Sequence, residues 1–406
     1  MARPAGAPPL PALFAAIMCA LLSLPACDAQ PDEGEAYEEI QVTDSPITVL
    51  DDDLVHVADL RVDGSGHTWV LTRYEPLVRV YDTEGRQVAG FGQPGGGPAE
   101  YGVASALVEG ELGMGVMDPQ RQRVRYYAPD GGFIEERPVE GGPRFPQEIR
   151  EVYFGDLGWT WEVPDGFLQD RYPPPPAGAP MQLQQAYDFW AAELILLPHD
   201  GSDPRTVVTF SDFSTFSPDD PPAPRPLSAG PLWDLCPDHE FVFHTGGAGE
   251  VVRVGLDGDV RSRHPVELPL EPPDRSLLVD WMVEVLSGVQ GMPGDTPEAL
   301  RERAEAVAEM AEPYLEPTVP PTRLRCDAAG RAWIQLFGMD HDRRGYARDW
   351  VVVDREGTLT ARVTFPVGFH PMRFEAERIV GVVRDELDVE TVGWVPALEA
   401  PGAGGG

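Results

Sequence analysis

The octad Val78–Gly85, VRVYDTEG, ends in an acidic residue followed by glycine, and it returns four more times along the 406-residue chain. The later copies are Val124–Gly131, Leu194–Gly201, Val251–Gly258 and Trp350–Gly357. Each copy joins a run of β-branched, aromatic or aliphatic residues, which is typical of a strand, to a turn whose glycine accepts positive φ. The repeat therefore predicts a hairpin at five places, and the 43 glycines and 44 prolines fit short strands joined by turns.

The residues around each octad complete a unit of four strands, A to D. Around the first octad we expect strands at 56–62, 67–73, 77–82 and 86–91. Further units are expected at 104–137, 151–210, 231–264 and 322–363. The last stretch, 374–394, supplies three strands, and a fourth can come from residues 40–50. This predicts an all-β fold, a six-bladed β-propeller that its N-terminal strand closes, which removes exposed sheet edges.

The first octad and the glycine-rich stretch after it, Phe91–Gly102, resemble an NHL-type repeat of the six-bladed propeller superfamily. Such a repeat has a similar strand, turn and strand, then a glycine-rich link with an aromatic residue before the next blade. The resemblance is clear in the first two units. We interpret Gly95–Gly97 as this link and not as a phosphate cradle, because no helix start follows it. An array of two-sheet β-sandwiches is the competing interpretation of the repeat.

The N-terminus has the pattern of a targeting segment. An apolar run, Leu13–Leu24, is too short to span a bilayer and matches a signal-peptide core. It leads into Leu24–Cys27, LPAC, which resembles the bacterial lipobox and implies cleavage before Cys27 and lipidation of that cysteine. An ordinary secretory signal is the alternative. The predicted organisation is a signal peptide at 1–26, an acidic tether at 27–45, a propeller at 46–397 and a flexible tail at 398–406.

The longest interruptions of the repeat fall in B–C loops and D-to-A links, which share one rim of a propeller. They are about 164–192, 338–348 and the 269–321 link between blades 4 and 5. The link has apolar residues at helical spacing in two stretches, and Thr296 and Pro297 form a start signal for the second helix. These helices either pack on the rim or form a surface for a partner, because elaborations on one face of a scaffold commonly carry function.

Few residues in this sequence carry recognisable chemistry. Cys236 and Cys326 end strand A of adjacent units, and they form either a disulfide or two buried thiols. Asp340 and His341 lie in a polar rim loop and, with Asp385, are the candidate ligands of a metal, although a solvated loop is the favoured interpretation. No catalytic motif is present, no cofactor is predicted, and a single divalent metal in the channel is the alternative.

Charge and composition narrow the classes of partner. The chain has 31 basic and 67 acidic side chains, a net charge of −36 and 42 % hydrophobic residues, which suits a folded core and disfavours nucleic acid as a partner. We expect a binding or scaffold module outside the cytoplasm, held by lipid on Cys27 at the periplasmic face of the inner or outer membrane. Its partner would be a protein, peptide or glycan at the elaborated rim. A metal-dependent enzyme, lyase or lactonase-like, is the less favoured alternative.

Overall fold

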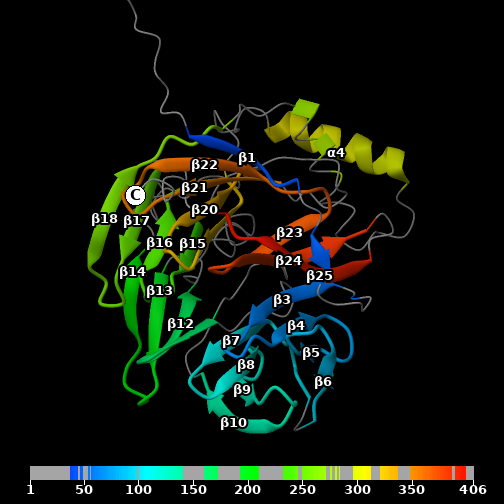
Figure 1. Ribbon diagram of the computed structural model, residues 1–406, viewed down its shortest axis with the longest axis vertical. Helices are drawn as coiled ribbons and strands as arrows, with labels where there is room; N and C mark the ends of the chain where they lie inside the picture. Colours follow the sequence, from blue (N-terminus) through cyan, green and yellow to red (C-terminus); the bar gives the residue numbers. More distant parts are fainter. Residues whose placement is uncertain are drawn as a thin grey trace, which may run out of the picture. The chain divides into compact units, whose positions relative to one another are not determined.

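The computed structural model describes strands in six sheets, each corresponding to one of the repeat units (Figure 1). The described residues are 37–43, 46–48, 54, 56–97, 100–139, 160–171, 193–209, 232–245, 249–270, 275–276, 279–280, 283, 296–311, 321–336, 348–385 and 389–398.

Blade 1 shows how the octad sets the fold. Its strands are β3 (Val57–Val62), β4 (Thr68–Thr72), β5 (Val78–Tyr81) and β6 (Gln87–Phe91), paired antiparallel in that order. The octad supplies β5 and the turn into β6, as the repeat predicts. The glycines that end the five octads have φ between +73° and +87°, which is the left-handed region that these turns require.

The next four blades repeat this meander. Blade 2 contains β7 (Ala106–Gly110), β8 (Gly113–Asp118), β9 (Arg123–Tyr127) and β10 (Phe133–Pro138). Blade 3 contains β11 (Thr160–Val163), β12 (Gly166–Arg171), β13 (Glu193–Pro198) and β14 (Arg205–Thr209). Blade 4 contains β15 (Leu232–Leu235), β16 (Phe241–His244), β17 (Glu250–Val254) and β18 (Val260–Pro265). Blade 5 contains β19 (Arg323–Cys326), β20 (Ala332–Gln335), β21 (Asp349–Val353) and β22 (Leu359–Thr364).

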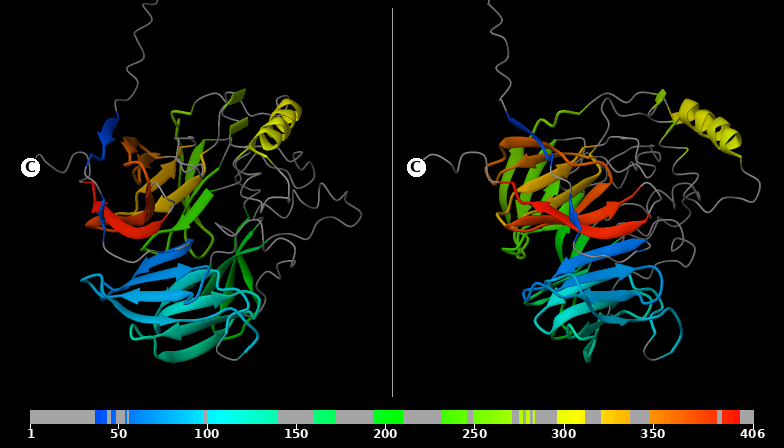
Figure 2. Two further views of the ribbon diagram at one scale, coloured as in Figure 1. Left: turned by 90° about the vertical axis from the view of Figure 1, so that its right-hand side faces the viewer. Right: turned by 45° about the vertical axis from the view of Figure 1, so that its right-hand side comes forward.

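Blade 6 takes its strands from both ends of the repeat region. Its first three are β23 (Phe369–Phe374), β24 (Arg378–Arg384) and β25 (Glu390–Pro396), and β2 (Ile47–Thr48) pairs antiparallel with β25. A second N-terminal strand, β1 (Glu38–Gln41), pairs in parallel with β22 as a fifth strand of blade 5. Figure 2 shows both N-terminal strands beside the blades formed by the end of the chain.

Two predicted boundaries are wrong at the ends of the fold. The tether was expected to run to residue 45, but β1 lies within it, because Ile40 and Val42 pack against the core between blades 5 and 6. The predicted tail begins at Leu398, which packs against the same cluster. Most of the tether, residues 27–36, lies outside the described part of the chain.

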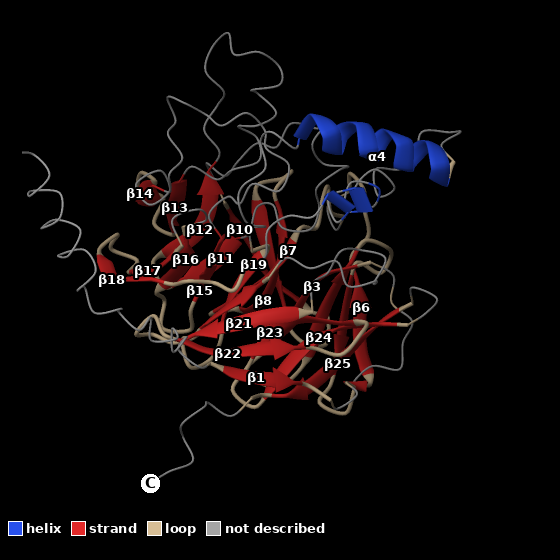
Figure 3. Cartoon of the chain, turned by 90° about the horizontal axis from the view of Figure 1, so that it is seen from above, coloured by secondary structure: helices blue, strands red, loops and turns tan. Residues whose placement is uncertain are grey.

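The link between blades 4 and 5 contains α4 (Pro297–Ala311). It starts at Pro297, and Thr296 Oγ1 accepts a hydrogen bond from the N–H of Ala299 at 3.3 Å, as an N-cap does. Ala304 and Ala308 are buried, so one face of the helix is covered. Figure 3 shows this helix against a fold that consists almost entirely of strands. The first predicted helix is described only at residues 275–276, 279–280 and 283, which are helical.

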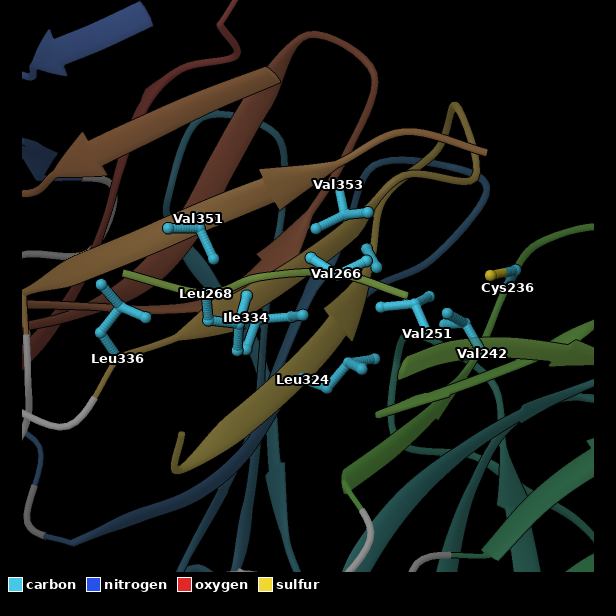
Figure 4. Close-up of a cluster of buried hydrophobic side chains, with 11 residues drawn as sticks. Cys236, Val242, Val251, Val266, Leu268, Leu324, Ile334, Leu336, Val351 and Val353 are labelled. Carbon is cyan, nitrogen blue, oxygen red and sulfur yellow. The ribbon is translucent and has the colours of Figure 1, made fainter. Parts of the chain in front are cut away.

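Hydrophobic clusters fill all six boundaries between successive blades, including the boundary from blade 6 back to blade 1. Figure 4 shows the cluster between blades 4 and 5, to which Val242 and Val251 of blade 4 and Leu324, Ile334 and Val351 of blade 5 all belong. The sheets thus close a ring in which each blade buries both faces against its neighbours, the architecture of a six-bladed β-propeller.

Candidate functional site

Two A–B turns have the same hydrogen-bonded aspartate. In blade 1, Asp63 accepts hydrogen bonds from two turn N–H groups and from Trp69 Nε1, the last at 2.9 Å. In blade 5, Asp327 does the same and binds Trp333 Nε1 at 2.9 Å. Both turns have the sequence Asp-x-x-Gly-x-x-Trp, a regularity that sequence reasoning missed although it is visible in the chain. The aspartate therefore fixes each turn to a buried tryptophan of strand B.

Asp59, on the innermost strand of blade 1, joins three blades. Its Oδ2 accepts the N–H of Leu107 from β7 at 2.9 Å, and its Oδ1 accepts Nη2 of Arg373 from β23 at 2.7 Å. Arg373 Nε also donates to the carbonyl oxygen of Leu60 at 2.8 Å. Burial, together with the positive charge of Arg61, lowers the pKa of Arg373 to about 10, and Asp59 opposes this effect.

Asp234 occupies the equivalent place in blade 4, three blades away around the ring. Its Oδ2 accepts the N–H of Cys326 from β19 at 2.9 Å, just as Asp59 accepts the N–H of Leu107. Both aspartates also accept the N–H of the residue that follows them. Neither carboxylate is therefore an open acceptor, since each holds the innermost strand of the next blade.

Two further buried carboxylates lie at other blade boundaries. Glu162 of β11 accepts the hydroxyl of Tyr126 and Nη1 of Arg137 from blade 2, both at 2.6 Å. It lies against Gly110, where a Cβ would fall 1.5 Å from its Oε2, so a larger residue there would displace the carboxylate. Glu390 of β25 accepts the N–H of Val57 at 2.7 Å and forms a buried ion pair with Arg384. These four acids hold the ring together at its boundaries.

Beside Asp59 lies a charged group with fewer contacts. Arg61 Nε has no hydrogen-bond partner in the described part of the chain, and its ion-pair contact with Asp59 Oδ2 is long, at 3.9 Å. Glu109 of β7 is exposed, yet the protein around it desolvates the carboxyl and raises its pKa, an effect that Arg61 opposes. Of the ionisable side chains around Asp59, Arg61 and Glu109 thus contribute least to holding the blades together.

Cys236 and Cys326 are joined by a disulfide, so of the two alternatives the structure has the bond. Their Cα atoms lie 5.1 Å apart, because the ends of β15 and β19 come close together at the blade boundary. Arg253 of β17 packs on this disulfide. Its Nη1 lies 3.7 Å from Sγ of Cys236, and its Nη2 donates to the carbonyl oxygen of Gly330 at 2.6 Å.

The other predicted site residues are not brought together by the described structure. Cys27, Asp340 and His341 lie outside the described residues. Asp385 lies between β24 and β25, and its Oδ1 accepts the N–H of Val389 at 2.9 Å, which closes its own turn. Among the described residues, no three His, Cys, Asp or Glu side chains are grouped as metal ligands would be, and no helix could cross a membrane.

The comparisons with known proteins bear on the fold. No protein-family model matches the chain, and no curated protein matches it. Among solved structures, a member of the DUF4221 family from Bacteroides vulgatus has a TM-score of 0.50 at 8 % identity, covering 88 % of this chain and 95 % of that one. A streptogramin B lyase gives 0.41 at 11 % identity, covering 87 % of each chain. Regucalcin from Agrobacterium tumefaciens gives 0.43 at 10 %, covering 90 % and 99 %. The class is a six-bladed β-propeller, and identities this low show the fold alone.

Proposed function

We propose that the chain is a lipid-anchored, extracytoplasmic propeller that binds a protein, peptide or glycan partner through its elaborated rim. The observation that carries this proposal is that the buried carboxylates already serve as hydrogen-bond acceptors within the fold. Asp59, Asp234, Glu162 and Glu390 all accept hydrogen bonds across blade boundaries, so they act as structural acceptors. A ring held rigid in this way is a scaffold on which loops and links can present a binding surface.

The link that contains α4 is the segment we assign to the partner. The buried Ala304 and Ala308 give this helix one covered face, while Glu302, Glu305 and Arg301 remain exposed on it. Arg301 Nη1 also contacts Asp280 Oδ1 at 3.2 Å, which ties α4 to an earlier part of the same link. A charged, accessible helix face suits recognition by complementary polar groups better than it suits burial in the core.

The test is capture of membrane-derived partners by the mature protein and by a variant in which residues 269–321 are replaced with a short Gly-Ser linker. We expect the variant to unfold in one cooperative transition, at a lower temperature because the buried contacts of Leu270, Ala304 and Ala308 are lost, and to lose the captured partner. Arg86→Ala, on an exposed turn of blade 1 where Arg86 pairs with Asp82, is the matched control and should capture normally. Unchanged capture by the linker variant would contradict the proposal.

A second measurement separates binding from metal-dependent catalysis. A ligand at a hundred times its dissociation constant stabilises the folded state by about 2.7 kcal/mol, which a melting curve resolves. We expect the same melting temperature with and without chelator. Stoichiometric metal together with a chelator-dependent melting temperature would overturn the binding proposal in favour of a metal-dependent enzyme.

A further inference from the structure

The two sulfur atoms of the Cys236–Cys326 disulfide lie in different electrostatic surroundings. Sγ of Cys236 is contacted by Nη1 of Arg253 at 3.7 Å. Arg253 is only 3 % exposed, and the described residues place no carboxylate in ion-pair contact with it. Burial lowers the pKa of this guanidinium, and the charges of Glu240, Asp327, Glu356 and Asp354 oppose that effect. A negative charge on Cys236 Sγ would lie in direct contact with this cation.

Cys326 has different surroundings. It is partly exposed, whereas Cys236 is buried, so an external reagent has better access to Cys326. The carboxylate of Asp234 accepts the N–H of Cys326 at 2.9 Å, and Asp327, the next residue in the chain, is paired with Arg331 at 2.6 Å. Acidic neighbours disfavour a thiolate, and a nearby cation favours one. The bond therefore has an accessible end, Cys326, and an end that leaves easily, Cys236.

We propose that this disulfide is a site of thiol–disulfide exchange with fixed polarity, whose reagent is an external dithiol such as a dithiol oxidoreductase. A thiolate of the reagent attacks Sγ of Cys326 and forms a mixed disulfide, while the electron pair of the broken bond goes to Sγ of Cys236. The second thiol of the reagent then attacks the reagent's other sulfur atom, which is part of the mixed disulfide. This step releases Cys326, which takes up the proton of the second thiol. The reagent is oxidised by two electrons to a disulfide, and the protein is reduced to a dithiol.

This exchange is separate from partner binding at the rim. Arg253 is a positioning residue in it, because it acts on the bond through the leaving sulfur. A leaving thiol of lower pKa departs faster, and stabilisation of the reduced form makes a disulfide easier to reduce. The exchange would open the covalent link between blades 4 and 5, while the hydrogen bond from Cys326 N–H to Asp234 stays available.

The experiment measures the rate and equilibrium of reduction of the folded mature protein by dithiothreitol. Arg253→Met should lower both the rate and the equilibrium constant for reduction at least tenfold, a shift of about 30 mV in potential for the latter. Arg355→Met is the matched control: Arg355 pairs with Asp238 and Glu240 at the same blade boundary, and its loss should change neither quantity more than twofold. Equal kinetics in the wild type and Arg253→Met would overturn the proposal.

Two single-cysteine variants test the polarity even if Arg253→Met does not fold. Cys326→Ser leaves the Cys236 thiol, and Cys236→Ser leaves the Cys326 thiol. Following thiolate absorbance against pH, we expect the Cys236 thiol to titrate below the Cys326 thiol, because Arg253 contacts Cys236 Sγ. A Cys236 thiol that titrates at or above the Cys326 thiol would show that Arg253 does not favour the leaving sulfur, and the proposal would fail.

Discussion

The matched aspartates of blades 1 and 4 allow one prediction with an internal control. Asp59→Ala removes the acceptor of the Leu107 N–H and also the acid that holds Arg373. The Arg373 guanidinium then remains largely buried beside the like charge of Arg61, and loss of one partner of a buried ion pair costs about 3–5 kcal/mol. Asp234→Ala leaves the N–H groups of Cys326 and Leu235 without their acceptor but breaks no ion pair among the described residues, at about 1–3 kcal/mol.

The same substitution at equivalent positions should therefore differ by about 2 kcal/mol in the free energy of unfolding. Urea unfolding monitored by tryptophan fluorescence measures both variants. Adding Arg373→Met to Asp59→Ala should recover part of the loss, because the buried cation that lost its ion-pair partner is gone. Losses that agree within about 0.5 kcal/mol, or no recovery in the double variant, would refute the idea that charge compensation dominates at Asp59.

Two more predictions rest on buried side chains of the structure, and a third rests on the lipobox-like sequence at Cys27. Burial lowers the pKa of His244 to about 4, below its unfolded value of about 6.5. The free energy of unfolding should therefore be highest above a pH of about 6.5 and fall by about 3 kcal/mol as the pH drops towards 4. His244→Gln should flatten that dependence in pH-resolved melting curves, while His264→Gln, on the outer strand β18, should not. Glu390→Gln keeps an acceptor for the Val57 N–H but breaks the buried ion pair with Arg384, so we expect about 3–5 kcal/mol of destabilisation in urea unfolding. Cys27→Ser should move the protein from the membrane fraction to the soluble fraction, because the proposed acyl anchor is lost; retention in membranes would argue against lipidation.

The sequence predicts the strands of blade 1 to within one or two residues, because strand residues and a turn glycine recur at fixed spacing there. It does not reveal β1, whose first two residues, Glu38 and Glu39, are acidic and exposed, so that only Ile40 and the adjacent Val42 mark it as part of the fold. That strand depends on an edge offered by β22, which lies more than three hundred residues further along the chain.

The candidate site was predictable only in its local parts. The Asp-x-x-Gly-x-x-Trp turns can be found by eye, since each aspartate binds groups within six residues of itself. The roles of Asp59 and Asp234 could not be found, because their partners belong to the next blade and depend on how two sheets meet. The disulfide shows the same limit: its Cα separation of 5.1 Å is a property of two converging strands and not of any spacing in the sequence.

The pairing of β2 with β25 has a consequence for biosynthesis. Residues 47–48 leave the ribosome early, but their partner, residues 390–396, is made almost last, and chains emerge N-terminal end first. Until then the ring is open, and the faces of blades 1 and 6 that bury Leu60 and Val380 have no cover. A chain that ends before residue 390 lacks the partner strand of β2, so the hydrophobic faces of this boundary stay exposed, which is a signal for chaperones and proteases.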